Sequence, residues 1–461
     1  MKFRKNLKFS TSGVRGIVGE SLTPLLTCSL AAAYGRYVGG GRVLVGRDTR
    51  PSGEMIENAV VAGLLSVGCQ PLLLGVVPTP TVQVMIVESG ANGGIVVTAS
   101  HNPAEWNALK LIGAEGTFLT ENEYAELSDI YNQEDFHFCG EELLRKVKYI
   151  ANGFKIHQDK IFNSIDIEDI RKRRFKVAVD CCNGVGAVYS RGFLEALGCE
   201  VFTVFDRADG NFERIPEPLP ENLDALCELV IREKCDIGFA QDPDGDRLSV
   251  VDNNGVALPT HYSLMMAADH ILSENPGTIV VNIQTTKNLE DIASSYGCGV
   301  EYAKVGEINV VRKMIEIGSE FGGEGNCGGV IWRRIHPGRD SFTTMALMLE
   351  MLSLCSESIA EIAATLDHYV NKSVKFYCSP FNSREIIRSL QERYSGEEQL
   401  TFDGLRINFE HGWVLVRQSN TEPVLRLTVE NSSSELADQQ LQRFTSEITE
   451  LKNQLESEIN V

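Results

Sequence analysis

Apolar and polar positions follow the same arrangement at three places along the chain. Each place has an apolar run typical of a strand, an amphipathic helical segment that ends in Gly-Cys, and a second short apolar run. The first runs span residues 42–48, 175–184 and 278–286, and the helix ends with their second runs span 64–75, 194–204 and 293–303. A strand, a helix and a strand at this spacing are typical of a βαβ crossover, which joins parallel strands. The pattern therefore predicts three related α/β domains.

The C-terminal part of the chain has a different pattern. Residues 373–378 predict a strand, 382–394 a helix, 401–419 a hairpin, 423–431 a further strand and 433–455 a long closing helix. Strands that follow one another directly favour antiparallel pairing and an α+β domain. We therefore expect an α/β fold of three related domains with mixed, mostly parallel sheets, followed by a C-terminal α+β domain. The expected boundaries are 1–155, 156–256, 257–371 and 372–461.

Composition and charge narrow the classes of function. The 461 residues correspond to about three domains at ~150 residues each, and 43% hydrophobic with 23% charged residues is typical of a soluble globular protein. The net charge of −20 argues against a nucleic-acid partner. The longest uncharged stretch, 59–87, is interrupted by prolines and glycines, so we expect no membrane span. The basic N-terminus MKFRKNLKFSTSGVRG is not followed by an uninterrupted apolar run, so we expect no signal peptide. Twelve scattered cysteines without a CxxC pair favour reduced thiols and a cytoplasmic protein.

The segment VVTASHNPAEWNALK, residues 96–110, places a serine at the end of a predicted strand. Strand ends and loops often carry functional side chains, and His101 and Lys110 lie close to Ser100 in the sequence. The alternative is that Ser100 only caps the following turn or helix. GxSxG is absent here, so this segment does not indicate an α/β-hydrolase.

The segment DIGFAQDPDGDRLSVVD, residues 236–252, delivers three carboxylates and an arginine after an apolar strand. Asp242, Asp244 and Asp246 at alternate positions can converge on one hard cation through oxygen ligands. They would repel one another without a cation to neutralise them. An EF-hand starting at Asp242 is excluded, because its sixth and twelfth positions would be Arg247 and Asn253. The alternative is a solvated acidic turn.

Three further segments carry polar side chains in loops. The loop VRQSNTEP offers a guanidinium, hydroxyls and an amide suited to a phosphate, and a polar hairpin turn is its alternative. The glycine-rich segment 321–340 offers Glu324 and Asn326 to sugar hydroxyls, and we interpret His336 as a loop residue. The tight loops 11–16 and 45–50 each contain arginine, and a structural Arg47–Asp48 ion pair is as plausible there as a functional role. In the loop VRQSNTEP, the side chains suited to a phosphate are those of Arg417, Ser419, Asn420 and Thr421.

Taken in this order, the segments resemble the α-D-phosphohexomutase family over essentially the whole chain. The serine loop TASHNP and the metal loop DPDGDR are highly specific as a pair. The resemblance implies four domains around a central cleft and a phosphosugar mutase that moves a phosphoryl group between O6 and O1 of a hexose phosphate. It also implies a phosphoserine, a bisphosphate intermediate, Mg²⁺ as cofactor and a hexose 1,6-bisphosphate as primer. We expect hexose phosphates as partners, with the chain a monomer or homodimer.

The resemblance implies roles for residues that match the family's motifs. Ser100 matches the family's phosphoserine. Asp242, Asp244 and Asp246 match its Mg²⁺ ligands, and the phosphoserine completes that set. Arg15 and Lys110 match residues near the transferring phosphoryl group, and we add His101 as a candidate catalytic residue. The implied substrate-binding residues are Arg247, Glu324, Asn326, Arg417, Ser419, Asn420 and Thr421.

Two departures bear on the sugar. Most members carry GE-x-S-G-H in the sugar loop, whereas this chain has GEGNCGG at 323–329, and VGEIN at 305–309 stands where many members have Gly-His-Ser. Both variants resemble a branch usually assigned to phosphoglucosamine mutase. Glucosamine 6-phosphate is therefore the expected substrate, with phosphoglucomutase or phosphomannomutase activity as the alternative.

Two more distant alternatives remain open from the residues. One is a phosphotransferase similar to haloacid dehalogenases, with an aspartyl nucleophile in DPDGD, although its usual DxDGT would need Thr at Asp246. The other is a non-catalytic phosphosugar-binding protein, which would not need both Ser100 and the aspartate triplet.

Overall fold

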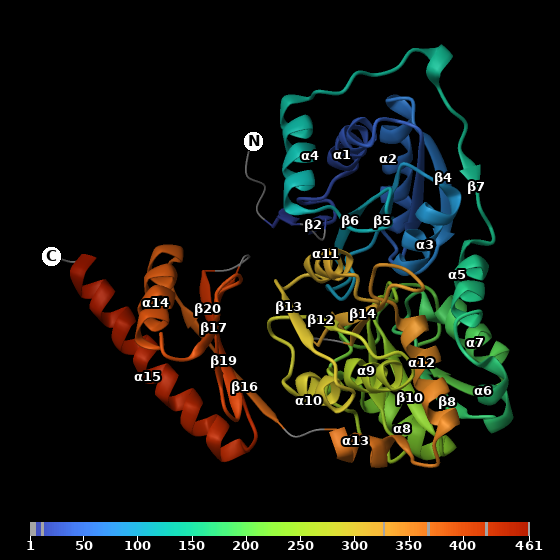
Figure 1. The fold of residues 1–461 in the computed structure, drawn as a ribbon. Coiled ribbons are helices and arrows are strands. Elements are labelled where there is room, and N and C mark those ends of the chain that lie inside the picture. The colour runs from blue at the N-terminus through green and yellow to red at the C-terminus, as the bar shows by residue number, and fades with distance from the viewer. Residues whose placement is uncertain (1–5, 11–12, 326–327, 367–368, 420–422, 460–461) are drawn as a thin grey trace.

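The computed structural model describes residues 6–10, 13–325, 328–366, 369–419 and 423–459. Within them the chain forms four β-sheets in succession, each with its own helices (Figure 1). The expected architecture of three α/β domains and a C-terminal α+β domain is confirmed. The three predicted βαβ crossovers are present, since β3 pairs with β4, β8 with β9 and β12 with β13, each in parallel.

The first sheet has seven strands in the order β1-β2-β6-β5-β3-β4-β7. β5, β3, β4 and β7 run parallel, whereas β6, β2 and β1 are added as an antiparallel edge. The strands are β1 (Lys8–Ser10), β2 (Gly13–Ile17), β3 (Arg42–Arg47), β4 (Gln70–Val76), β5 (Gly93–Val97), β6 (Trp106–Gly113) and β7 (Lys148–Tyr149). The helices are α1 (Pro24–Tyr37), α2 (Gly53–Ser66), α3 (Thr79–Ser89) and α4 (Glu121–Gln133), with a 3-10 turn at Glu141–Leu143. Thr120 and Glu123 form a capping box that starts α4.

The second and third sheets have four strands each, in the orders β11-β10-β8-β9 and β13-β12-β14-β15. In both sheets three strands are parallel and one edge strand is antiparallel. The second unit contains α5 (Gly153–Phe162), α6 (Ile167–Arg173), β8 (Lys176–Asp180), α7 (Gly186–Ala196), β9 (Glu200–Val204), a 3-10 turn at Pro220–Asn222, α8 (Asp224–Glu233), β10 (Ile237–Gln241) and β11 (Leu248–Val251). The third contains α9 (Tyr262–Glu274), β12 (Ile279–Asn282), α10 (Asn288–Ser295), β13 (Val300–Ala303), α11 (Glu307–Ile317), β14 (Phe321–Glu324), β15 (Gly329–Trp332), α12 (Ser341–Leu354) and α13 (Ile359–Leu366).

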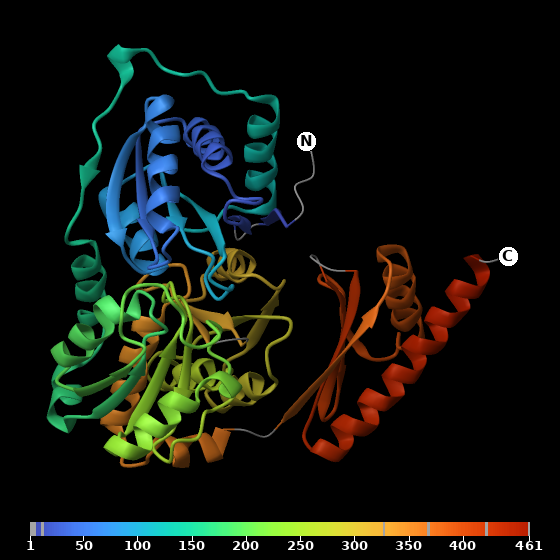
Figure 2. The same cartoon turned by 180° about the vertical axis from the view of Figure 1, so that it is seen from behind.

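The fourth sheet is antiparallel, in the order β16-β20-β19-β18-β17. Its elements are β16 (Val370–Tyr377), α14 (Pro380–Arg393), β17 (Glu398–Leu400), β18 (Leu405–Phe409), β19 (Gly412–Gln418), β20 (Val424–Asn431) and α15 (Ser434–Ile459). Ser433 caps α15 by accepting a hydrogen bond from the Leu436 N–H at 3.2 Å. Figures 1 and 2 show α14 and α15 on the side of this sheet that faces away from the third domain.

The hydrophobic core does not follow the four sheets one by one. Two clusters lie on opposite faces of the first sheet, since Val43 and Val45 belong to one and Leu44 to the other. The second and third sheets share one continuous cluster that includes Phe239, Phe342 and Met345. The fourth domain has its own cluster around Phe444. The second and third domains are therefore joined by a common core, which fixes the position of the loops between them.

The fourth domain contacts the third through a buried arginine. Arg406 donates to the Ile283 carbonyl at 3.0 Å and to the Tyr302 hydroxyl at 3.1 Å, and its guanidinium lies 4.3 Å from the Tyr302 ring centre. Beside it, Trp413 packs in a small cluster with Ile283 and donates to Glu430 at 2.8 Å. These contacts place the edge of the fourth domain next to the glycine-rich segments of the third.

Candidate active site

Ser100 lies three residues after β5 in a left-handed backbone conformation, with φ of 49°. Non-glycine residues rarely adopt this conformation, and it is found most often where function requires a particular geometry. Its N–H donates to the Thr98 hydroxyl at 2.9 Å, which fixes the turn. The side chain is 3% exposed, and its hydroxyl is presented to the second domain rather than to the following helix or turn.

Arg50 holds the serine loop from behind. Its guanidinium donates to the carbonyls of Ser100 and Asn102 at 2.6 Å each, and to those of Pro103 at 2.7 Å and Trp106 at 3.0 Å. Asp48 accepts from the Arg50 Nε at 3.1 Å and from the Thr98 hydroxyl at 2.7 Å. The expected Arg47–Asp48 ion pair is wrong, because Arg47 pairs with Glu57 at 3.3 Å and Asp48 pairs with Arg50.

The aspartate loop connects β10 to β11, and all three of its carboxylates are buried. Gly245 allows the loop to turn because its φ is +69°, a conformation that disfavours other residues. The Ser341 hydroxyl donates to the Gly245 carbonyl at 2.7 Å and anchors the loop to the start of α12. The three side chains are therefore held by packing on both sides and do not form a solvated turn.

The serine and aspartate loops meet across the interface of the first two domains. The Ser100 hydroxyl donates to Asp242 Oδ2 at 2.7 Å, although the two residues are 142 positions apart. Lys110, on β6, donates to Asp244 at 2.6 Å and to Asp246 at 2.8 Å. The structure thus brings Ser100, Lys110 and the triplet together.

The triplet has the oxygen donors that a hard cation requires. One carboxylate oxygen from each aspartate lies within 4.8 Å of the others. Asp244 Oδ1 and Asp246 Oδ1 are buried and accept no hydrogen bond among the described residues. Burial, together with the charges of Asp244 and Asp246, raises the pKa of Asp242 well above its ordinary value. These are the properties of a site that a divalent cation would complete.

Positive side chains balance part of this negative charge. Although burial opposes it, Arg339, Lys110 and Arg247 together lower the pKa of Asp246. Arg339 donates to Asp246 at 3.1 Å, to Glu307 at 2.8 Å and to Glu324 at 3.4 Å. One guanidinium therefore connects the aspartate loop with two carboxylates of the third domain.

A pocket between the first three domains contains six of the fourteen predicted site residues. It is lined by Arg15, Ser100, His101, Lys110, Arg247 and Glu324. Burial, together with the nearby Arg247 and Arg15, lowers the pKa of His101. Its Nδ1 lies 3.4 Å from the Ser100 hydroxyl. Arg15 donates to the Asn102 side chain at 2.7 Å, which keeps it beside the serine loop.

The phosphate-loop residues lie elsewhere. Arg417, at the end of β19, donates to Asp403 at 2.9 Å, and Asp403 accepts from the Val305 N–H at 2.8 Å. Ser419 is buried and donates its N–H to the Val424 carbonyl at 2.8 Å. Arg417 does not line the pocket around Ser100, but Asp403 connects it to the VGEIN segment that does. Asn326, Asn420 and Thr421 lie outside the described residues.

Sequence reasoning missed three residues of this site. Arg339 and Glu307 line the pocket, and Arg50 supports the serine loop. All three stood inside segments already singled out, 321–340, 305–309 and 45–50. Nothing in one sequence indicated that Arg339 bonds to both Glu307 and Asp246. His336, interpreted as a loop residue, does lie in the loop between β15 and α12, where it is buried.

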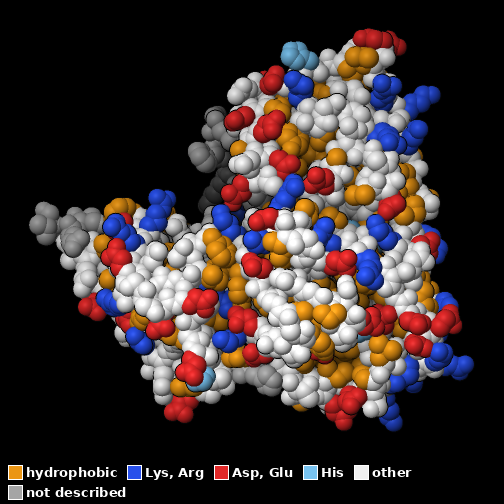
Figure 3. Space-filling model, in the orientation of Figure 1, with side chains coloured by type: hydrophobic (Ala, Val, Ile, Leu, Met, Phe, Trp, Pro, Cys, Tyr) orange, Lys and Arg blue, Asp and Glu red, His pale blue; other side chains and the backbone are white. Residues whose placement is uncertain are grey.

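Surface properties add two observations. Positive and negative side chains are interspersed over the face shown in Figure 3. Across the part of the chain that the structure describes, no helix is both long enough and apolar enough to span a membrane.

Comparison with known proteins places the chain in a family. The phosphoglucomutase/phosphomannomutase α/β/α domains I, II and III match residues 6–138, 155–255 and 259–369, and the family's C-terminal domain matches 379–447. A phosphoglucomutase/phosphomannomutase of Thermococcus kodakarensis is 38% identical over 94% of this chain and 96% of that protein. A probable phosphoglucosamine mutase of Methanopyrus kandleri is 34% identical over 93% and 95%.

A crystal structure agrees with these relatives. A phosphoglucomutase/phosphomannomutase family protein from Burkholderia thailandensis superposes with a TM-score of 0.85 at 29% identity, and the match covers 96% of this chain and 98% of that one. The resemblance that the serine and metal loops indicated is confirmed over all four domains. The chain belongs to the phosphoglucomutase/phosphomannomutase family and is a phosphohexomutase.

Proposed function

We propose that this phosphohexomutase transfers its phosphoryl group through Ser100, between O6 and O1 of a hexose phosphate. The observation that carries the proposal is the position of the Ser100 hydroxyl. It lies 2.7 Å from Asp242 of a buried carboxylate triplet and opens into a pocket lined by Arg15, Lys110 and Arg247. A nucleophile surrounded by cations and beside a candidate metal site suits phosphoryl transfer.

The cycle begins with phosphorylated Ser100. A hydroxyl oxygen of the bound hexose monophosphate attacks the phosphorus, the bond to the serine oxygen breaks, and a hexose 1,6-bisphosphate forms. The bisphosphate turns over in the cleft, and the Ser100 oxygen attacks its other phosphate and releases the isomeric monophosphate. An added hexose 1,6-bisphosphate would prime unphosphorylated enzyme by the same second step.

The charged residues around Ser100 have separate roles in this scheme. Asp242, Asp244 and Asp246 would hold Mg²⁺ together with the phosphoserine, and the ion would neutralise charge on the transferring group. Lys110 and Arg15 would stabilise the same charge from the first domain. Arg247 and Glu324 would contact the substrate, and His101 would exchange a proton with the reacting hydroxyl.

The C-terminal domain would hold the phosphate that is not reacting. Arg417 and Ser419, with Asn420 and Thr421 beyond the described residues, form the loop that we assign to this phosphate. A guanidinium and hydroxyls bind a phosphate without requiring one fixed orientation of the sugar. Such a loop can serve both orientations of the bisphosphate.

Asp244→Asn is expected to weaken Mg²⁺ binding by about tenfold or more, because one fewer negative oxygen holds the cation. Activity should fall at low Mg²⁺ and recover in part at high Mg²⁺. Calorimetric titration with Mg²⁺ and initial rates across a Mg²⁺ series measure the two effects. Asp224→Asn, an exposed carboxylate at the start of α8, is the matched control. Wild-type activity that persists in excess chelator would contradict the metal assignment.

We propose glucosamine 6-phosphate as the preferred substrate. Glu307 occupies the place where many family members carry histidine, and it lines the pocket together with Glu324. Although both carboxylates share the Arg339 guanidinium, two of them in this pocket would favour a protonated 2-amino group on a bound sugar. The name of the Methanopyrus kandleri relative supports the same sugar. Phosphoglucomutase or phosphomannomutase activity is the second candidate, favoured by the name of the Thermococcus kodakarensis relative.

The substrate assignment predicts a ratio of rates. We expect kcat/KM to be highest for the glucosamine phosphate when glucosamine, glucose and mannose phosphates are compared under one concentration of primer. Glu307→Gln should reduce the preference for glucosamine over glucose by about tenfold, since a charge-assisted hydrogen bond contributes about 1.5–3 kcal/mol. Glu115→Gln, whose side chain is 67% exposed, is the control. A tenfold preference for glucose or mannose phosphate in the wild type would refute the glucosamine assignment and leave the mutase intact.

A further inference from the structure

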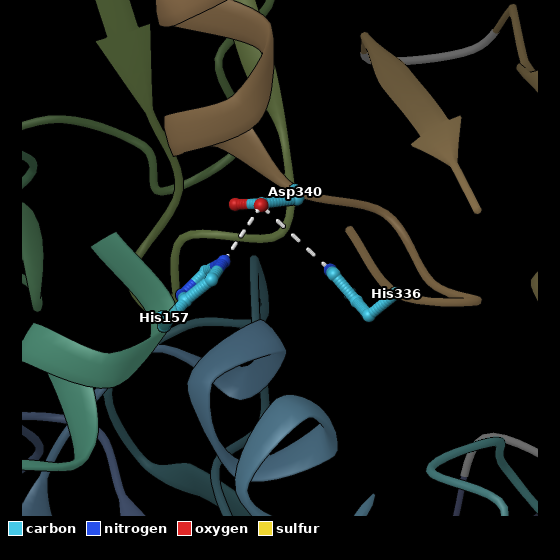
Figure 4. Close-up of side chains that lie close together, drawn as sticks. All are labelled: His157, His336 and Asp340. Carbon is cyan, nitrogen blue, oxygen red and sulfur yellow. Dashed lines mark hydrogen bonds and ion pairs between the residues drawn. The ribbon is translucent and has the colours of Figure 1, made fainter. Parts of the chain in front are cut away.

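A second cluster of ligating side chains lies behind the aspartate loop. His157 belongs to α5, His336 to the loop after β15, and Asp340 caps α12. Their exposures are 0%, 3% and 2%, so all three are buried. Figure 4 shows both imidazole rings directed at one oxygen of the Asp340 carboxylate, His157 from the lower left and His336 from the lower right. None of the roles assigned above uses this cluster.

The distances suit a small transition-metal ion. His157 Nε2 lies 2.9 Å and His336 Nε2 lies 3.7 Å from Asp340 Oδ2, and the three ligand atoms are all within 4.8 Å of one another. Two ligands bonded to Zn²⁺ at about 2.0–2.2 Å in a tetrahedron lie about 3.3–3.5 Å apart. The two measured separations lie on either side of that value, so small shifts of the rings would bring the donors to bonding distance.

The charge of Asp340 requires a partner. No ion pair among the described residues joins it to lysine or arginine; its oxygens accept from the Phe342 N–H, the Thr343 hydroxyl and the imidazole of His157. A buried carboxylate needs positive charge nearby, supplied here either by a proton on an imidazole or by a metal ion.

The surroundings of His336 favour a metal ion, rather than a proton on an imidazole, as the positive partner of Asp340. Both of its ring nitrogens are buried and have no hydrogen-bond partner among the described residues. Its Nε2 faces Asp340 Oδ2 at 3.7 Å, an ion-pair contact that is too long for a hydrogen bond. A buried polar atom without a hydrogen bond calls for an explanation such as an unseen ion. His157, in contrast, has a second contact, because its Nδ1 lies 3.1 Å from the Thr81 hydroxyl of α3. A hydrogen bond at the far nitrogen is the usual way in which a metal-ligating histidine is oriented.

We propose that His157, His336 and Asp340 bind one divalent transition-metal ion of the Zn²⁺ class, at a site separate from the aspartate triplet. Two imidazoles and one carboxylate suit Zn²⁺ or Co²⁺, whereas the all-oxygen triplet suits Mg²⁺. Three protein donors are fewer than the four of a closed structural site. A water molecule would complete the coordination, and Co²⁺ is the probe in the test below.

Such an ion would connect parts of the chain that meet at the active site. It would join α5 to the loop that precedes α12. Ser341, next to Asp340, anchors Gly245 of the aspartate loop. Binding should therefore stabilise the folded protein, because an ion that binds only the native state raises the midpoint of thermal unfolding.

The test measures Co²⁺ uptake by the full chain in excess Mg²⁺, with equilibrium dialysis and elemental analysis. We expect one Co²⁺ per chain, with the visible absorption typical of cobalt bound by nitrogen ligands, and a higher Tm with the metal. Asp244→Asn should retain the cobalt, because it alters only the triplet. His336→Ala should lose it, and Thr81→Val should bind it about tenfold more weakly through loss of the orienting hydrogen bond.

His411→Ala, an exposed histidine after β18, controls for surface binding. The proposal is overturned if the wild type takes up no Co²⁺ in excess Mg²⁺. It is equally overturned if the Co²⁺ that it takes up is lost in Asp244→Asn or is fully retained in a folded His336→Ala. Should His336→Ala fail to fold, Thr81→Val decides in its place: Co²⁺ affinity equal to that of the wild type would overturn the proposal.

Discussion

Ser100→Ala should reduce mutase turnover by several orders of magnitude, because the side chain that would carry the phosphoryl group is removed. Lys110 and Arg247 line the same pocket, but neither offers a hydroxyl to take its place. Intact-protein mass spectrometry should find one phosphate on wild-type protein after incubation with a hexose bisphosphate, and none on the variant. Far-UV circular dichroism should be unchanged, since the alteration removes one oxygen.

The same experiment separates serine from aspartate as the nucleophile. A phosphoserine survives acid, whereas an aspartyl phosphate is hydrolysed by it, so the phosphorylated protein is treated with acid before its mass is measured. Ser66→Ala, in α2, is the control, because its hydroxyl bonds only within its own helix, to the Gly63 carbonyl at 2.7 Å. Near-normal turnover by Ser100→Ala, or phosphate on the wild type that is lost in acid, would show that Ser100 is not the carrier.

The parts of this fold that could be predicted are those that depend on neighbouring residues. Apolar runs separated by amphipathic segments fixed three βαβ crossovers, because each strand and helix buries a face that its own sequence defines. β1, β2 and β6 were not foreseen as an antiparallel edge of the first sheet. Two-residue β7, which joins that sheet from residue 148, has almost no pattern of its own. Its place depends on β4, more than seventy residues earlier.

The candidate site also has parts that the sequence predicted and parts that it did not. Ser100 and the three aspartates were identified because each group lies in a short, distinctive segment. The contact between Ser100 and the aspartates is a tertiary contact, which a local sequence pattern does not predict. The same holds for the contacts of Arg339 with Asp246, Glu307 and Glu324. The shared core of the second and third sheets brings these loops together. Only a resemblance to a family could anticipate that arrangement from one sequence.

Arg50→Met should destabilise the fold by about 3–5 kcal/mol, the usual cost of removing one partner from a buried ion pair. Burial raises the pKa of Asp48 against the opposing effects of Arg50 and the Thr98 hydrogen bond. Without Arg50, Asp48 would have to take up a proton or remain charged without its partner. Four carbonyls of the serine loop would also lose their donor. Urea unfolding followed by circular dichroism measures the loss of stability.

Because Arg50 holds the Ser100 and Asn102 carbonyls at 2.6 Å, its loss should also lower kcat at temperatures where the variant remains folded. Arg50→Lys separates the two effects: it keeps the charge beside Asp48 but cannot reach four carbonyls at once, so its activity should fall more than its stability. The double variant Asp48→Asn/Arg50→Met removes both charges, and it should lose about 1–3 kcal/mol less than the sum of the two single losses. Additive losses would mean that Arg50 acts by packing alone, for instance against the Phe212 ring 4.8 Å away. Full activity of Arg50→Lys would mean that the serine loop keeps its left-handed turn without the clamp.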